Sequence, residues 1–97
     1  MTQFDSIVST IRRLKPELIQ KYGVSSIGLF GSIVRDDYST SKSDIDIIVD
    51  FSKPIGIEFI DLAEFLEATF KRKIDLVSKN GIKNKYLREI EREIVYV

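Results

Sequence analysis

Apolar side chains recur three and four residues apart in three stretches of the chain, residues 4–22, 57–71 and 83–93. This is the spacing of amphipathic helices packed on a core. Pro16 interrupts the first stretch, so the pattern predicts either a kink or a break with a second short helix opening at Pro16. Gly23 follows the first stretch in the position of a C-terminal cap.

Three shorter stretches have the character of strands, residues 24–30, 44–51 and 74–77. In the second of these the alternation is strict, because Ile45, Ile47, Val49 and Phe51 point one way and Asp44, Asp46, Ile48 and Asp50 point the other. Residues 32–37 fit one or two helical turns, and residues 38–43 are polar and typical of a loop. The predicted order is α-β-(short α)-β-α-β-α.

Connection lengths then predict how the strands pair. The crossover over residues 51–73 is long enough for a βαβ unit, so the second and third strands are expected to be parallel. The short connection between the first two strands favours antiparallel pairing. The predicted fold is α/β, of the α+β type: a small mixed three-stranded sheet with helices packed on it, forming a single domain over residues 1–97.

Composition narrows the possible chemistry. The chain has 97 residues, 15 Lys and Arg against 15 Asp and Glu, and neither Cys nor His. Disulfides, Cys or His metal sites and His-dependent nucleophilic catalysis are therefore excluded, and a bound metal has to accept oxygen ligands, as Mg²⁺, Mn²⁺ and Ca²⁺ do. The balanced charge gives no signal for nucleic-acid binding. No apolar run approaches the ~20 residues of a membrane span, and the expected location is the cytoplasm.

The candidate chemistry lies in Gly31-Ser32 and Asp44-Ile45-Asp46. Two carboxylates at alternate strand positions share one face and can converge on a hard cation. Antiparallel pairing of the first two strands brings Gly31 and Ser32 beside this aspartate pair. Glycine lets backbone approach a phosphate closely, and the amides after it open a helical turn, a natural anion site. Taken alone, an Asp-x-Asp pair can equally well face water.

Two further residues extend the constellation. Arg35 lies one turn after Ser32 and can add positive charge at a phosphate. Asp75, at the start of the third strand, lies beside the start of the second strand if those two are parallel. Three carboxylates, Asp44, Asp46 and Asp75, suit two Mg²⁺ ions in phosphoryl chemistry. The simpler interpretation of Asp75 is a solvent-facing residue at a strand start.

Gly31-Ser32 followed by Asp44-Ile45-Asp46 resembles the signature of the DNA polymerase β-type nucleotidyltransferase superfamily. The segments LFGS, SDIDIIV, KIDLV and REIVYV resemble its minimal nucleotidyltransferases (MNT), over nearly the whole chain. The resemblance implies ATP as substrate with two Mg²⁺ ions. Gly31, Ser32 and Arg35 would bind the nucleotide; Asp44, Asp46 and Asp75 would bind metal and be catalytic. Asp36 replaces the glycine that usually follows the motif arginine, which puts the contacts of Arg35 in question.

The resemblance also implies a partner. Members of this family are commonly antitoxins that transfer AMP from ATP to a Tyr hydroxyl of a HEPN-domain toxin, and the small size of this chain leaves the acceptor to a partner protein. The expected function is therefore a Mg²⁺-dependent protein adenylyltransferase acting as an antitoxin in a hetero-oligomer. Two alternatives stay open: an antitoxin that neutralises its partner by binding alone, and a nucleotidyltransferase acting on a small molecule or an RNA end.

Overall fold

The computed structural model describes residues 3–35 and 44–97. The helices are α1 (Gln3–Tyr22), α2 (Ser32–Arg35), α3 (Glu58–Phe70) and α4 (Asn84–Glu91), and the strands are β1 (Val24–Phe30), β2 (Ile45–Phe51), β3 (Ile74–Ser78) and β4 (Val95–Tyr96). The predicted order of helices and strands is confirmed up to α4. The loop expected over residues 38–43 lies outside the described part of the chain.

Within the described residues, the strands form one sheet in the order β3-β2-β1-β4. β1 and β2 are antiparallel and β2 and β3 are parallel, as the connection lengths predict. The expectation of three strands is wrong, because Val95 and Tyr96 add a fourth strand antiparallel to β1. A strand of two residues is too short for its own alternation to be visible in the sequence.

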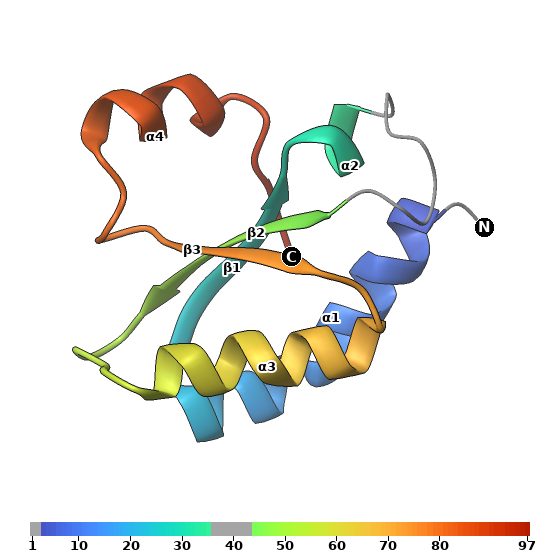
Figure 1. The fold of residues 1–97 in the computed structure, drawn as a ribbon, viewed down its shortest axis with the longest axis vertical. Coiled ribbons are helices and arrows are strands. Elements are labelled where there is room, and N and C mark those ends of the chain that lie inside the picture. The colour runs from blue at the N-terminus through green and yellow to red at the C-terminus, as the bar shows by residue number, and fades with distance from the viewer. Residues whose placement is uncertain (1–2, 36–43) are drawn as a thin grey trace.

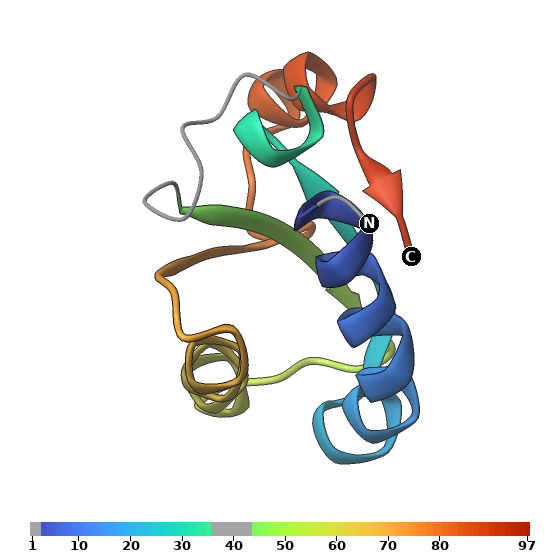
Figure 2. The ribbon, with the colours of Figure 1, turned by 90° about the vertical axis from the view of Figure 1, so that its right-hand side faces the viewer.

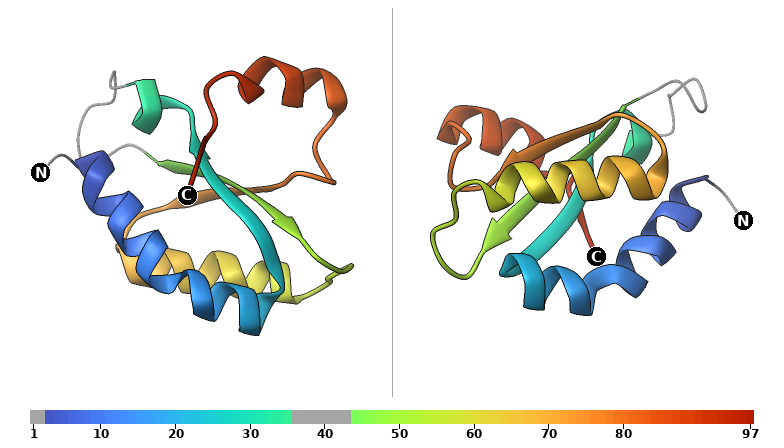
Figure 3. Two further views of the ribbon diagram at one scale, coloured as in Figure 1. Left: turned by 180° about the vertical axis from the view of Figure 1, so that it is seen from behind. Right: turned by 60° about the horizontal axis from the view of Figure 1, so that its bottom comes forward.

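One face of the sheet carries the main core. α1 and α3 pack on this face, as Figure 1 and the view from behind in Figure 3 show. The inward residues of β2 predicted by the alternation, Ile45, Ile47 and Val49, are fully or almost fully buried there. The core continues through α1, β1, α2, α3 and β3 with Ile7, Ile11, Leu18, Tyr22, Val24, Ile27, Leu29, Ile33, Leu62, Leu66 and Ile74. Burial of this face fixes which side chains of β2 point the other way.

The opposite face of the sheet is covered by α4, which lies across the sheet from α3 (Figures 1 and 2). A second, smaller core of Phe30, Ile48 and Ile90 holds it there, with Val77, Ile82, Leu87 and Ile94 packed against it. Ile48 is on the face of β2 that also carries Asp46, because residues two apart in a strand share a face. Asp46 and α4 are therefore on the same side of the sheet.

Pro16 does not end the first helix. α1 is continuous from Gln3 to Tyr22 with Pro16 inside it, so the alternative of a second helix opening at Pro16 is wrong. A proline in a helix removes one backbone hydrogen bond, but Ile11 and Leu18, on either side of it, are fully buried. Packing of both halves on the sheet offsets the local cost. Gly23 closes the helix as predicted, with φ of 69° and its N–H donating to the Ile19 carbonyl at 3.1 Å.

Candidate active site

The end of β1 and the start of β2 meet at Gly31. Gly31 follows Phe30, which is paired with Asp46, and has φ of 76°, in the left-handed region that favours glycine. A Cβ atom at this position would overlap Asp46 Oδ2 and approach Asp46 Cγ to 3.0 Å. Glycine is therefore required for two reasons, the backbone conformation and the carboxylate lying against its Cα. The predicted juxtaposition of the Gly-Ser turn and the aspartate strand is present.

Asp46 and Asp75 are cross-strand neighbours. The parallel register of β2 and β3 places Asp46 directly beside Asp75, and the antiparallel register of β1 and β2 places Phe30 on the other side of Asp46. Adjacent strands are about 4.8 Å apart, so two carboxylates on the same face are close enough to share a cation. Asp46 is half-buried and Asp75 is exposed, so the pair opens to solvent on the β3 side.

Asp44 lies just before β2, and its side chain contacts Lys73. Its Oδ2 atom is 4.0 Å from Lys73 Nζ, and both side chains are largely exposed, at 47% and 75%. An exposed ion pair at this distance is weak. The contact nevertheless shows that the residue before β2 and the residue before β3 lie side by side, which is the arrangement that parallel pairing of those strands imposes.

The oxygen donors suit a hard cation such as Mg²⁺, and the carboxylate of Asp46 already lies against Gly31. Within residues 3–35 and 44–97, however, no three acidic side chains come together closely enough to hold a metal ion. The expected convergence of Asp44, Asp46 and Asp75 is thus seen as one neighbouring pair, Asp46 and Asp75, with Asp44 turned to Lys73. Asp44 and Asp75 are exposed, so their side chains are free to reorient, and the oxygen donors present fit a hard cation.

The remaining sequence-predicted residues are partly outside the described region. Ser32 opens α2 and is half-buried, directly after Gly31. Arg35 is the last residue of α2, but its side chain is outside the described part of the structure, as is Asp36.

A residue that the sequence patterns do not single out also contacts the site. Glu93 Oε1 accepts a hydrogen bond from the Gly31 N–H at 3.1 Å, across 62 positions of sequence. Glu93 lies between α4 and β4 and is half-buried. No spacing rule relates it to Gly31, because the contact depends on β4 pairing with β1. Its place in the REIVYV segment is the only signal in the sequence.

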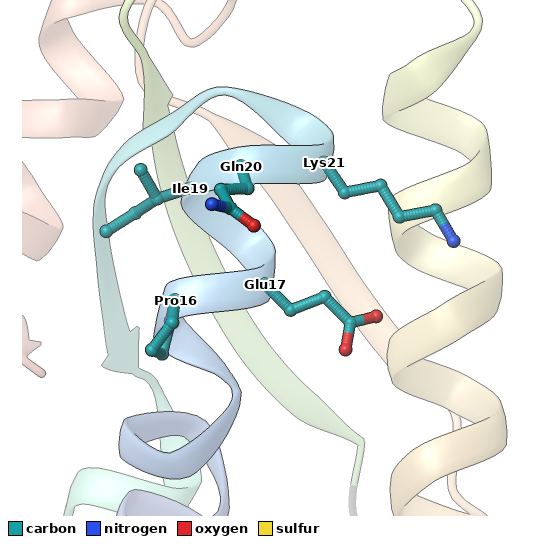
Figure 4. Close-up of a pocket in the computed structure, with 5 residues that line it drawn as sticks. All are labelled: Pro16, Glu17, Ile19, Gln20 and Lys21. Carbon is teal, nitrogen blue, oxygen red and sulfur yellow. The ribbon is translucent and has the colours of Figure 1, made fainter.

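A hollow elsewhere on the described surface has no such chemistry. It is lined by Pro16, Glu17, Ile19, Gln20 and Lys21 in the second half of α1 (Figure 4). The side chains extend to different sides of the helix instead of converging on one point. The hollow is near the start of β1, whereas Gly31 follows its end, roughly 20 Å away at the rise of an extended strand. It does not belong to the candidate site.

Comparison with known proteins agrees with the fold and the motifs. Residues 11–97 match the family model for the nucleotidyltransferase domain. A protein adenylyltransferase, MntA, from Thermococcus cleftensis is 41% identical over 98 residues, covering 100% of this chain and 98% of the relative.

None of the described helices is both long enough and apolar enough to cross a membrane.

Two solved structures share the fold at low sequence identity. One, described provisionally as a minimal nucleotidyltransferase, superposes with a TM-score of 0.80 at 21% identity, covering 97% of this chain and 95% of that chain. The other is a complex of a tri-AMPylated Shewanella oneidensis HEPN toxin with an MNT antitoxin. It superposes with a TM-score of 0.61 at 22% identity, covering 96% of this chain and 66% of that chain.

The sheet topology and the sequence match are thus those of a nucleotidyltransferase enzyme. The chain belongs to the nucleotidyltransferase domain family, among the relatives of the protein adenylyltransferase MntA.

Proposed function

We propose that this nucleotidyltransferase transfers AMP from ATP to a Tyr hydroxyl of a HEPN-domain partner and thereby acts as its antitoxin. The observation that carries the proposal is the contact of Gly31 with Asp46, with Asp75 beside it, because it joins a phosphate-binding turn to carboxylates. The 41% sequence identity with an MntA adenylyltransferase, which extends over the whole chain, supports adenylyl transfer. The fold shared with a HEPN–MNT complex supports the partner.

The residues divide the chemistry between them. Gly31, Ser32 and Arg35 bind the phosphates of ATP, and Asp44, Asp46 and Asp75 hold Mg²⁺, which supplies charge neutralisation of the triphosphate and the pyrophosphate. The acceptor hydroxyl oxygen forms a bond to the α-phosphorus, the bond from that phosphorus to the bridging oxygen breaks, and pyrophosphate leaves. Asp75, the more exposed carboxylate of the neighbouring pair, accepts the hydroxyl proton.

The location of the reaction and the extent of the domain are parts of the same proposal. Because the reaction consumes ATP, we propose the cytoplasm as its location. We also propose that residues 1–97 act as one domain, since α1, α3 and α4 share a single sheet.

The test is to incubate the chain with ATP, Mg²⁺ and the HEPN protein and to measure the intact mass of the latter. The expected result is an increase of about 330 Da for each AMP, abolished in Asp46→Asn and in Asp75→Asn. Asp50→Asn is the matched control, because Asp50 is on the same strand but its Oδ1 accepts from the Phe51 N–H. An unmodified HEPN protein in the wild-type reaction would refute the proposal.

The same variants separate the two alternatives. If the antitoxin acts by binding alone, its Asp46→Asn variant would still protect cells fully, and the mass of the partner would not change. A transferase acting on a small molecule or an RNA end would release pyrophosphate from ATP without the HEPN protein. The proposed protein acceptor instead requires pyrophosphate release to depend on the partner.

A further inference from the structure

Gly31 is held between two carboxylates, one from the middle of the sequence and one from near its C-terminus. Asp46 Oδ2 lies against its Cα, and Glu93 Oε1 accepts a hydrogen bond from its N–H at 3.1 Å. The first contact belongs to the proposed metal and phosphate site. The second involves a residue to which neither the motifs nor the mechanism above gives a role.

The backbone around Glu93 is fixed on both sides. Its N–H donates to the Ile90 carbonyl at 2.9 Å, which continues the end of α4, and Ile90 is buried in the second core. Two residues further on, Val95 pairs with Leu29 of β1. Because both anchors are parts of the folded core, the carboxylate of Glu93 reaches Gly31 from a defined position.

Gly31 needs such a contact more than another residue would. Glycine has the greatest backbone freedom of any residue, and here it has φ of 76°. Its N–H lies in the Phe30–Gly31 peptide plane, and the orientation of that plane together with the φ and ψ of Gly31 sets the direction in which Ser32 leaves the strand. A hydrogen bond from an amide to a carboxylate is stronger than one between neutral groups, so Glu93 is well suited to fix that plane.

We propose that Glu93 is a positioning residue that holds the Gly31 peptide so that the Ser32 hydroxyl faces the triphosphate. The inference rests on the proposed function for the identity of the ligand, but the contact itself can be measured without any transfer reaction. Glu93 acts through Gly31, and no contact of its own with the nucleotide is required.

The test compares Glu93→Ala with Glu93→Gln, which keeps an oxygen acceptor, and with Glu91→Ala as an exposed control at the end of α4. The first measurement is the amide resonance and hydrogen exchange of Gly31 in the nucleotide-free protein. Glu93→Ala is expected to shift that resonance and speed its exchange at least about tenfold, whereas Glu91→Ala leaves both unchanged. An unchanged Gly31 amide in Glu93→Ala would overturn the contact.

The second measurement is the steady-state kinetics of transfer to the partner. Loss of a hydrogen bond to a charged group predicts that Glu93→Ala raises KM for ATP about 10- to 100-fold, with kcat changed less than about threefold, because a positioned phosphate ligand acts in both ground and transition states. Glu93→Gln is expected to recover KM to within about threefold. A wild-type KM in Glu93→Ala, or a fall in kcat alone, would overturn the positioning role.

The two measurements keep the failure modes apart. If the wild-type chain transfers no AMP, the proposed function fails, and the Gly31 amide still reports whether Glu93 fixes the turn. If the wild-type chain is active and Glu93→Ala is indistinguishable from it, the inference fails and the proposed function stands. Melting temperatures of all three variants show whether a loss of activity reflects unfolding. If Glu93→Ala is unfolded, Glu93→Gln, which preserves the acceptor, decides the outcome.

Discussion

Gly31 and Gly23 form a matched pair for testing how closely the site is packed. Both have positive φ, 76° and 69°, so alanine at either position incurs about 1–2 kcal/mol of backbone strain. At Gly23 the nearest atom to an added Cβ is Lys53 Cε at 3.6 Å, an ordinary contact. At Gly31 the added Cβ overlaps the Asp46 carboxylate, which can rotate away for about 0.5–1.5 kcal/mol.

The two variants should therefore have similar stability and different activity. We expect Gly23→Ala and Gly31→Ala each to lose about 1–2 kcal/mol of stability, with about 0.5–1.5 kcal/mol more for Gly31→Ala, or roughly 4–8 °C in Tm for each kcal/mol. Displacement of Asp46 from the position beside Asp75 should reduce the transfer rate about 100-fold, the typical cost of a 1 Å misplacement. Gly23→Ala should keep nearly wild-type activity.

The assay is AMP transfer at a temperature well below both melting points, with thermal unfolding measured on the same preparations. Gly31→Ala as active as Gly23→Ala would refute the reasoning, because it would mean that the carboxylate of Asp46 can leave Gly31 without consequence. A much larger stability loss in Gly31→Ala would show that Asp46 cannot rotate and that the strand itself is displaced.

Three further outcomes are expected. Gly28→Ala would bring a Cβ to 2.8 Å from Ile94 Cγ2 and 3.2 Å from the Val95 carbonyl oxygen. Denaturant titration should therefore show a loss of about 1–3 kcal/mol in the free energy of unfolding, and no loss would contradict the packing of β4 on β1. Hydrogen bonds from its own N–H and that of Gly56 hold the pKa of Glu58 below its ordinary value. Its contribution to stability is present above the ordinary pKa of a glutamate and lost as the pH falls through the lowered pKa, and Glu58→Gln should remove this dependence in acid titrations followed by circular dichroism. Lys73→Ala should change stability by less than about 0.5 kcal/mol and tighten Mg²⁺ binding in calorimetric titrations by freeing Asp44; weaker binding would contradict that competition.

Local pattern and connection length were sufficient to predict the centre of the fold. The strict alternation of residues 44–51 determines which side chains of β2 share a face, and the two connection lengths predict that β2 pairs antiparallel with β1 and parallel with β3. Gly31 marks the end of β1 because a turn follows directly. These features depend on residues near one another in sequence or on one connection each.

The features that were missed depend on contacts between distant segments. β4 forms only because Val95 and Tyr96 meet β1, and the contact of Glu93 with Gly31 depends on that pairing. The continuity of α1 through Pro16 likewise reflects burial of Ile11 and Leu18, which outweighs a local preference to end the helix. The detailed placement of the carboxylates depends on exposed side chains such as Asp44, which backbone register does not fix.

The pairing of β1 with β4 has a consequence for the order in which the protein matures on the ribosome. β1 is made early in synthesis, but the acceptor for the Gly31 amide arrives only with residue 93. Synthesis proceeds from the N-terminus, so a nascent chain that has already exposed Gly31, Asp46 and Asp75 still lacks the contact that orders its turn. We therefore expect the competence to bind nucleotide to appear late, when the segment containing β4 leaves the exit tunnel.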